Sequence, residues 1–481
     1  MIPNWLMQRA YLTPEKAALS FGDDTWTFAQ LKHKSMQLAE KLAANGLQEG
    51  QRIALLGPSN ADMVFIIHAC MLTGLEIVML NSRLTTKELE WQLEDSGADA
   101  VIVADDMSAV IANSAVRLLP YSTIEQSEGQ PFVVQDLWTA DRTITIMYTS
   151  GTTGFPKGVR QTVGNHVSSA LSSVLNLGLN DKDVWLCAMP LFHISGFSIL
   201  VRSVLYGMEV RLYEKFDPIQ TAQEIRDGSV TRMSVVSLTL DKILRELEKD
   251  NAMAHPSFQT MLAGGGSVPV DYLERAVQRN IPVLQTYGMT ETSSQTATLA
   301  AGDAMRKMGS AGKPLFFNQI KIKDMKNPYD KGEVFIRGPH VTPGYIGRFS
   351  AVHPLEEGWL PTGDIGYFDE EGYLYIVDRR SDLIISGGEN IYPAEIENAL
   401  VAHPGVSEAG VCGREHSEWG SVPVAFVVVT GNVPVEELRL FCEQRLARYK
   451  VPKEFRFVDK LPRNASNKLL RRELREWVEQ E

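Results

Sequence analysis

Short apolar strands alternate with amphipathic helices in the N-terminal part of the chain, and this alternation constrains the fold more than any other feature. A capping-box sequence, Thr27 to Gln30, precedes apolar residues that recur at helical spacing. Further along, we expect strands at 52–56, 76–80 and 100–104, and helices near 61–73 and 86–96. Alternating strands and helices form parallel sheets with helices on both faces. The predicted fold class is therefore α/β.

A second pattern begins near residue 380. A strand is expected at 373–377, and the five polar residues 378–382 then interrupt it. Beyond them we expect a small α+β unit, with a helix starting near Pro393, strands at 406–412 and 423–429, and a helix near 434–448. The sequence thus predicts two domains, 1–380 and 381–481, and a charged hinge would let the second one move. A plain linker with a fixed interface is the alternative.

Composition excludes several classes of protein. The chain has 481 residues, too many for one compact core, and a net charge of −12 without a long basic block, which argues against a nucleic-acid partner. Its four cysteines are scattered, as expected for reduced thiols in the cytoplasm. The most apolar run, 63–80, is interrupted by polar residues and glycine, so no membrane span is expected. The sequence leaves open whether the chain is a homo-oligomer.

A loop rich in glycine and hydroxyl groups follows the apolar strand at 144–148. The residues that suit an anion are Thr149, Ser150, Gly151, Thr152, Thr153, Gly154 and Lys157. Glycines let backbone N–H groups turn toward a phosphate, the hydroxyls add donors, and the lysine adds charge. The spacing is not that of a Walker A loop. A surface turn is the alternative, but such turns rarely combine so many hydroxyls with Pro-Lys-Gly.

Two later segments carry residue types that suit a nucleotide. Gly264, Gly265 and Gly266 end an apolar strand and leave room for a flat ring near the backbone. Tyr287 offers a stacking face, Thr290 a phosphate donor, and Glu291 a carboxylate of the kind Mg²⁺ prefers. Each has a structural alternative, since Thr-Glu is also an ordinary helix start.

Isolated polar residues elsewhere are weaker signals. Asp364 follows a tight turn and suits a ribose diol, which Arg379 would also reach, although an Asx-turn and a surface ion pair explain them equally well. His193 lies among apolar neighbours and is more often a core residue than a gate. Lys468 would offset charge repulsion near a phosphate, and its alternative is a merely exposed lysine. Gly387 and Gly388 resemble a hairpin turn.

Together and in this order, these segments resemble the adenylate-forming superfamily of acyl-CoA synthetases, peptide-synthetase adenylation domains and beetle luciferases. The resemblance covers essentially the whole chain. It implies a large N-terminal domain of α/β subdomains and a small mobile C-terminal domain. It also implies ATP, Mg²⁺ and coenzyme A as ligands, and a small-molecule carboxylic acid as substrate.

The resemblance implies a role for each motif. Thr149 to Lys157 would hold the β,γ-phosphates, and His193 would gate the acyl pocket. Gly264 to Gly266 and Tyr287 would enclose adenine, Asp364 and Arg379 would bind ribose, Thr290 the α-phosphate, and Glu291 the metal. Lys468 would serve adenylate formation, and Gly387 and Gly388 would approach pantetheine in thioester formation. Lys468 and the Gly387–Gly388 pair lie on the same small domain but serve different steps. A rotation of this domain about 380–382 between adenylate formation and thioester formation is therefore implied.

Two positions depart from the family pattern. The hinge falls on Ser381, where the family typically has Asp or Lys, and Phe155 is bulky for a phosphate loop. Phe155 need not disturb the loop if its side chain faces solvent or the small domain.

Within the superfamily the chain most resembles the o-succinylbenzoate–CoA ligases of bacterial menaquinone biosynthesis. The segments that carry this narrower resemblance are 161–166, 191–196, 380–395 and 461–470. Three alternatives stay open: another aryl- or fatty-acyl-CoA ligase, an adenylation module that loads a carrier protein, and a non-enzymatic nucleotide sensor.

Overall fold

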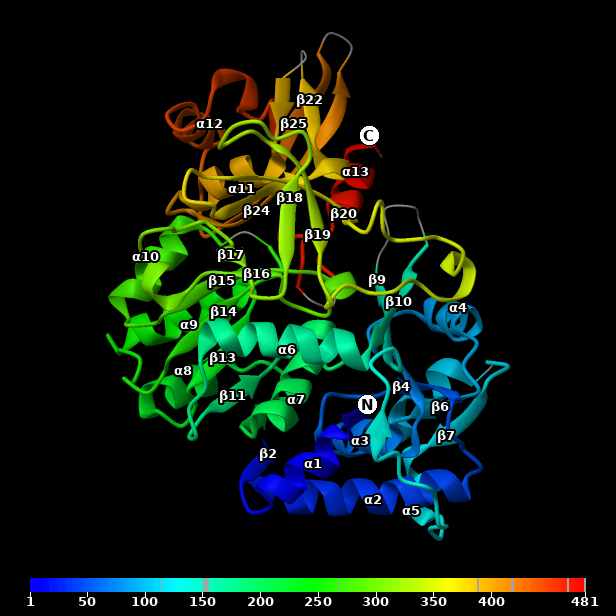
Figure 1. The fold of residues 1–481 in the computed structure, drawn as a ribbon. Coiled ribbons are helices and arrows are strands. Elements are labelled where there is room, and N and C mark those ends of the chain that lie inside the picture. The colour runs from blue at the N-terminus through cyan, green and yellow to red at the C-terminus, as the bar shows by residue number, and fades with distance from the viewer. Residues whose placement is uncertain are drawn as a thin grey trace.

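The computed structural model describes residues 1–112, 114–149, 155–266, 268–386, 389–416, 419–464 and 467–479. In Figure 1 the C-terminal elements, drawn in orange and red, form the upper part of the molecule above the green and blue sheets. The order of elements is mixed α/β, as predicted.

The first large sheet has six strands, all parallel to their neighbours except β10, which is antiparallel to β9. Across the sheet these are β10 (Lys157–Thr162), β9 (Thr143–Thr149), β5 (Glu76–Met79), β4 (Arg52–Leu56), β6 (Ala100–Val103) and β7 (Arg117–Pro120). The helices between them are α2 (Phe28–Ala44), α3 (Ala61–Thr73), α4 (Thr86–Ser96) and α5 (Tyr121–Gln126). The predicted capping box is confirmed, because the Gln30 backbone N donates to Thr27 Oγ1 at 3.3 Å and the Thr27 N donates to Gln30 Oε1 at 2.9 Å.

The second large sheet has nine strands, with a parallel centre and antiparallel pairs at both edges. Its strands are β17 (Lys313–Pro314), β16 (Ala297–Thr298), β15 (Val283–Tyr287), β14 (Thr260–Ala263), β13 (Arg232–Val235), β11 (Val184–Cys187), β12 (Glu209–Leu212), β2 (Ala17–Phe21) and β3 (Asp24–Thr27). Its helices, with α1 from the N-terminus, are α1 (Trp5–Leu12), α6 (Val163–Leu177), α7 (Ile194–Tyr206), α8 (Pro218–Asp227), α9 (Ser237–Lys249) and α10 (Val270–Gln278). A short pair, β1 (Ile2–Pro3) and β8 (Leu137–Trp138), lies outside both sheets.

A third sheet is antiparallel and ends at the predicted hinge. It consists of β18 (Gln319–Ile322), β19 (Gly332–Arg337), β20 (Leu360–Phe368) and β21 (Leu374–Arg379). The expectation that polar residues interrupt the strand from 378 is wrong. Asp378 and Arg379 still pair with Ile365 and Asp364, because a neighbouring strand satisfies their backbone groups whatever their side chains are. The chain leaves the strand only in the short turn η5 (Arg380–Asp382).

The C-terminal region has its own sheet and its own core. The strands are β23 (Glu389–Ile391), β22 (Ile384–Ser386), β25 (Gly420–Val429), β24 (Val406–His416) and β26 (Glu454–Phe457). The helices are α11 (Pro393–Val401), α12 (Val435–Glu443) and α13 (Arg471–Glu479). Two buried apolar clusters draw their members from Ile384 to Val478. The predicted helix near 434–448 is shorter than expected and ends at Glu443. The exact domain boundary stays a prediction.

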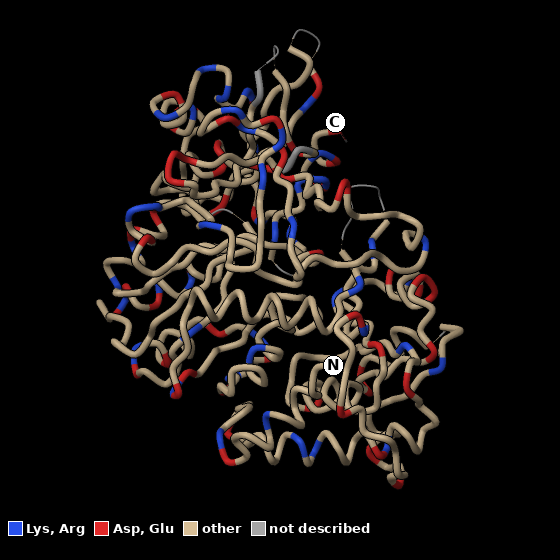
Figure 2. Tube along the Cα trace, in the orientation of Figure 1, with Lys and Arg blue, Asp and Glu red and all other residues tan. Residues whose placement is uncertain are grey.

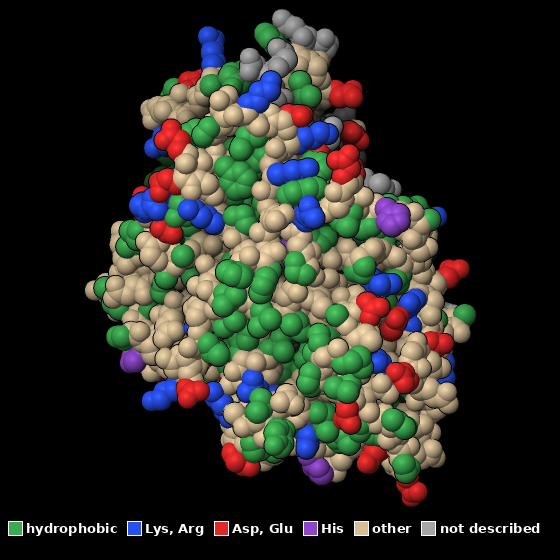
Figure 3. All heavy atoms as spheres, in the orientation of Figure 1, with side chains coloured by type: hydrophobic (Ala, Val, Ile, Leu, Met, Phe, Trp, Pro, Cys, Tyr) green, Lys and Arg blue, Asp and Glu red, His purple; other side chains and the backbone are tan. Residues whose placement is uncertain are grey.

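The surface of the described part mixes both charges. Figure 2 shows lysines and arginines interspersed with acidic residues along the whole trace. No helix in the residues described is long and apolar enough to cross a membrane. Figure 3 shows hydrophobic side chains gathered over α6, where Leu171 and Leu175 are 43% and 61% exposed.

Candidate active site

The nucleotide end of the candidate site lies at the carboxyl ends of two neighbouring parallel strands. Gly264 follows β14 and Tyr287 ends β15, and these strands pair through Ala263 and Gln285. Gly265 has a φ of +82°, a conformation that favours glycine. The carboxyl edge of a parallel sheet is where α/β proteins bind ligands. The structure therefore brings Gly264, Gly265, Gly266 and Tyr287 to one edge, as predicted.

The two residues predicted for ribose are cross-strand neighbours. Asp364 in β20 lies opposite Arg379 in β21, although the side chain of Arg379 is outside the described part. The Tyr287 hydroxyl donates to Asp364 Oδ2 at 2.6 Å, and Asp364 is only 5% exposed. A buried carboxylate held by a tyrosine leaves its second oxygen in a fixed direction. The predicted adenine and ribose residues are thus joined directly.

Thr290 and Glu291 lie in the short turn η2 (Thr290–Thr292). They do not begin a long helix, which was the structural alternative for this segment. Glu291 is buried at 8% exposure, and its carbonyl accepts from the Thr342 N at 2.7 Å. The loop folds back tightly, since a Cβ on Gly288 would lie 1.6 Å from the Ser294 carbonyl oxygen. Gln161 in β10 donates to the Thr290 carbonyl at 2.8 Å. This bond ties the loop to the strand that follows the predicted phosphate loop.

The ends of the predicted phosphate loop face each other. Thr149 ends β9, Lys157 begins β10, and the two are direct partners in the antiparallel pair. The residues between them, Ser150, Gly151, Thr152, Thr153 and Gly154, lie outside the described residues. Their role in phosphate binding therefore stays a prediction, with its two anchoring strands in place.

Tyr345 connects the predicted phosphate lysine with the predicted metal ligand. The Lys157 ammonium lies 5.2 Å from the centre of the Tyr345 ring. At the other end of the ring, the Tyr345 hydroxyl hydrogen-bonds to Glu291; burial first, and then the Glu291 charge, raise the pKa of that hydroxyl. Sequence reasoning missed Tyr345 because nothing in its local sequence marks it.

Phe155 packs on the N-terminal region and does not face the small domain. Its ring lies 5.6 Å from Trp91 of α4, and the Arg348 guanidinium lies 4.1 Å above it. The side chain is 46% exposed, so it lies partly in solvent. The bulky residue anchors the end of the loop against α4, which explains how it is tolerated there.

The Glu291 carboxylate suits a Mg²⁺ ion that is bound together with the phosphates of a substrate. Among the residues described, no group of three or more His, Cys, Asp or Glu side chains could hold a metal ion by itself. Mg²⁺ commonly takes one or two protein carboxylates together with substrate phosphates and water. A single buried carboxylate at Glu291, beside the strands of the phosphate loop, fits that pattern.

His193 caps the N-terminus of α7 and is neutral at pH 7. Its ring lies 4.7 Å from that of Phe192, and its Nε2 is buried with no hydrogen-bond partner among the described residues. Burial, and then the charge of Arg83, lower the pKa of His193 to about 4. A neutral ring with an unpaired nitrogen suits the wall of a pocket better than proton transfer.

Arg202, on the same helix, is a buried cation that sequence reasoning missed. It is 1% exposed, and Nη2 donates to Gln295 Oε1 at 2.9 Å and to Ser294 Oγ at 3.2 Å. No carboxylate of the described residues forms an ion pair with it, and burial lowers the pKa of its guanidinium. By contrast, the equally buried Arg232 lies 3.0 Å from Asp183. An arginine inside the apolar run 194–206 was the available signal.

Lys468 lies on an exposed loop just before α13. Its backbone N donates to Asn464 Oδ1 at 2.8 Å, and the Asn464 N donates to the Lys468 carbonyl at 2.9 Å. These bonds close the loop on itself around the lysine. Gly387 and Gly388 lie outside the described residues, so their approach to pantetheine stays a prediction.

Two family models match the chain. The model for AMP-binding enzymes covers residues 6–346, and the model for the C-terminal domain of AMP-binding enzymes covers residues 395–468. The chain belongs to the AMP-binding enzyme family. The resemblance to the adenylate-forming superfamily is thereby confirmed.

Relatives of this AMP-binding enzyme match along its whole length. A 2-succinylbenzoate–CoA ligase from Bacillus subtilis is 47% identical, with 98% of each chain covered. Among solved structures, an o-succinylbenzoate CoA synthetase from Bacillus subtilis in complex with the acyl-adenylate intermediate has a TM-score of 0.93, at 46% identity and 98% coverage of both chains. A double mutant of that synthetase bound to a product analogue has a TM-score of 0.76, at 47% identity and the same coverage.

Proposed function

We propose that this AMP-binding enzyme is an AMP-forming acid–thiol ligase that adenylates 2-succinylbenzoate with ATP and transfers the acyl group to coenzyme A. This is the ligation that serves menaquinone biosynthesis. The observation that carries the proposal is the full-length likeness to 2-succinylbenzoate–CoA ligases. The direct bond between Tyr287 and Asp364, the residues expected at adenine and ribose, supports it.

In the proposed first step, the substrate carboxylate attacks the ATP α-phosphorus, a P–O bond forms, and pyrophosphate leaves. Tyr287 and Asp364 hold the nucleoside, Thr290 faces the α-phosphate, and the loop ending at Lys157 holds the departing pyrophosphate. Lys468 offsets the charge that builds up when two anions meet. Mg²⁺ on Glu291 would add further charge neutralisation of the phosphates when bound.

In the proposed second step, the coenzyme A thiol attacks the acyl carbonyl of the mixed anhydride. A C–S bond forms, the C–O bond to AMP breaks, and the thiol proton passes to solvent. No covalent enzyme nucleophile is needed, since AMP is a good leaving group. Gly387 and Gly388 would let pantetheine pass close to the backbone. We propose that the domain formed by 381–481 turns about 380–382 between the steps.

The buried cation at Arg202 supports a substrate with two carboxylates. One carboxylate of 2-succinylbenzoate reacts, and the other must be held by a charged or polar group. A guanidinium that forms no ion pair with a carboxylate of the described residues, on the helix that His193 caps, provides such a group. A benzoate or fatty acid has no second anion to satisfy it.

The experiment that tests this function is a pyrophosphate-release screen of the purified chain over carboxylic acids, with ATP, Mg²⁺ and coenzyme A. The acids should include 2-succinylbenzoate, benzoate and medium-chain fatty acids, and mass spectrometry should identify the thioester. We expect 2-succinylbenzoate to give the highest kcat/KM. A higher value for benzoate or a fatty acid would contradict the proposed substrate, and thioester formed only on a carrier protein would contradict the proposed acceptor.

A further inference from the structure

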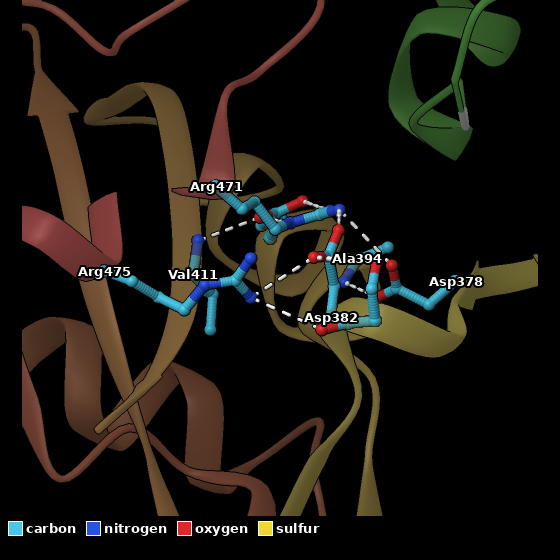
Figure 4. A network of polar contacts seen from close by, with 8 residues as sticks. Asp378, Asp382, Ala394, Val411, Arg471 and Arg475 are labelled. Carbon is cyan, nitrogen blue, oxygen red and sulfur yellow. Dashed lines mark hydrogen bonds and ion pairs between the residues drawn. The ribbon is translucent and has the colours of Figure 1, made fainter. Parts of the chain in front are cut away.

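Arg471 lies three residues after Lys468, at the first position of α13, and contacts three carboxylates (Figure 4). Its Nε and Nη2 bind the Glu397 carboxylate at 3.0 Å and 2.6 Å. Its Nη1 lies 3.3 Å from Asp378 Oδ1 and 3.2 Å from Asp382 Oδ2. One guanidinium thus joins three separate segments of the chain.

These carboxylates lie before, within and after the turn η5. Asp378 belongs to β21 in the third sheet, one residue before the partner of Asp364. Glu397 belongs to α11, and its Oε1 also accepts from the Val411 N of β24 at 2.8 Å, so it moves with the C-terminal sheet. The Arg471–Asp378 pair therefore crosses the predicted hinge, whereas the Arg471–Glu397 pair does not.

A second bond crosses the hinge at the same carboxylate. Asp378 Oδ2 accepts from the Ala394 N, in the first turn of α11, at 2.9 Å. The Asp378 carboxylate thereby binds a backbone N–H of α11 and the Arg471 side chain of α13. Turning the C-terminal region about 380–382 would separate Asp378 from both.

The network is sheltered from water. The Arg471 and Asp378 side chains are 15% and 2% exposed. Burial lowers the pKa of Arg471, but the charges of Glu397, Asp378 and Asp382 outweigh it, so the net pKa is raised and the guanidinium stays charged. Ion pairs this sheltered matter far more than exposed ones, because removing one partner leaves the other charge buried and unpaired.

We propose that Arg471 is a positioning residue for acyl-adenylate formation: by pairing with Asp378 it holds the segment of Lys468 against the ribose-binding strands. The pair breaks when the C-terminal region turns for thioester formation. This inference rests on the proposed two-step function. The Arg471–Asp378 ion pair would stabilise the arrangement of the two regions in which the first step takes place.

The test measures each half-reaction separately in the full-length chain. Acyl-adenylate formation is followed as single-turnover pyrophosphate release with 2-succinylbenzoate, and thioester formation is followed from supplied acyl-adenylate and coenzyme A. We expect Asp378→Asn, which keeps an oxygen acceptor for Ala394 and leaves the Arg471–Glu397 pair intact, to slow the first step about tenfold and the second by less than about twofold.

Matched variants separate positioning from folding. Arg471→Met should reproduce the loss in the first step, and Arg471→Lys should restore part of it. Arg472→Met removes the same charge one residue further on, where the side chain is 72% exposed and forms an ion pair with Glu476 of the same helix. We expect Arg472→Met to leave both steps within about twofold of wild type.

A second readout does not depend on catalysis. Trypsin cleaves after arginine, so cleavage after Arg379 and Arg380 reports opening of the hinge. Asp378→Asn and Arg471→Met should raise this cleavage rate several-fold, and Arg472→Met should not. Equal losses in both half-reactions, or equal cleavage in all variants, would overturn the role of Arg471. A wild-type chain that releases no pyrophosphate would instead contradict the proposed function.

Discussion

The N-terminal and C-terminal regions hold their functional residues in different ways. In the N-terminal region, Tyr287 binds the buried Asp364 directly, and Tyr345 binds the buried Glu291. In the C-terminal region, Lys468 lies on an exposed loop, and the nearby Arg471 reaches the rest of the molecule through ion pairs. Bonds between buried residues of the N-terminal region favour a site that keeps its shape, whereas an ion pair across the predicted hinge can be exchanged.

The contrast teaches which residues can be specific to one step. The nucleotide is present in both steps, as ATP and then as the acyl-adenylate, so its residues should serve both. A region that turns about 380–382 can present Lys468 in one step and Gly387 and Gly388 in the other.

The largest expected effect is specific to the first step. Lys468→Ala should slow acyl-adenylate formation by on the order of a hundredfold or more, because a preorganised charge at the reacting phosphate is lost. Conversion of supplied acyl-adenylate to thioester should continue at close to the wild-type rate. Rapid-quench assays of each half-reaction measure this, and equal loss in both would break the contrast between the two regions.

Arg202→Met should raise the KM for 2-succinylbenzoate roughly fiftyfold, since the second carboxylate loses its charged partner. The KM for ATP should change little. Unfolding of the free enzyme should be unaffected or shifted to higher temperature, because the variant removes a buried charge that has no carboxylate partner among the described residues.

Arg232→Met is the matched control for that variant. It leaves the Asp183 side chain, which is 0% exposed, without its partner, and should lower the free energy of unfolding by about 3–5 kcal/mol. A comparable loss of stability in Arg202→Met would show that Arg202 has a structural partner instead of a substrate.

Asp364→Ala should slow both half-reactions by about twentyfold at subsaturating nucleotide, because a charged hydrogen-bond acceptor for the ribose is lost. The effect on the second step distinguishes this variant from Lys468→Ala. A loss confined to one step would contradict the claim that the N-terminal region serves both.

The smallest effect concerns the residue that sequence reasoning missed beside Glu291. Tyr345→Phe keeps the ring beneath Lys157 but removes the hydroxyl bond to Glu291. Supporting bonds to a metal ligand tune affinity, so the apparent Mg²⁺ affinity should weaken about tenfold. Titration of Mg²⁺ at fixed ATP measures it, and an unchanged half-saturation point would separate Glu291 from the metal.

Local sequence patterns predicted the strands of the first large sheet. The alternation gave the strands near 52, 76 and 100, and the glycine-rich strand end and Tyr287 meet because neighbouring parallel strands share an edge. The pairing of Asp364 with Arg379 follows from the register of β20 and β21. Motif order therefore predicted much of the candidate site.

Contacts between segments far apart in the sequence could not be predicted from local sequence patterns. Tyr345 interacts with Glu291, and Arg202 interacts with Gln295. Both contacts join segments that are far apart in the sequence, so no local spacing predicts them. The strand β21 extends through two charged residues because its neighbour pairs with them. The same holds for Arg471, whose partners come from three elements.

The most direct test of the central claim is a two-stage single-turnover experiment with the wild-type chain. Enzyme, ATP, Mg²⁺ and 2-succinylbenzoate are mixed without coenzyme A, and coenzyme A is then added. We expect about one equivalent of bound acyl-adenylate to form with the release of pyrophosphate, and coenzyme A then to convert it to thioester and AMP. Pyrophosphate release that requires coenzyme A, or an intermediate that does not react with it, would contradict the account.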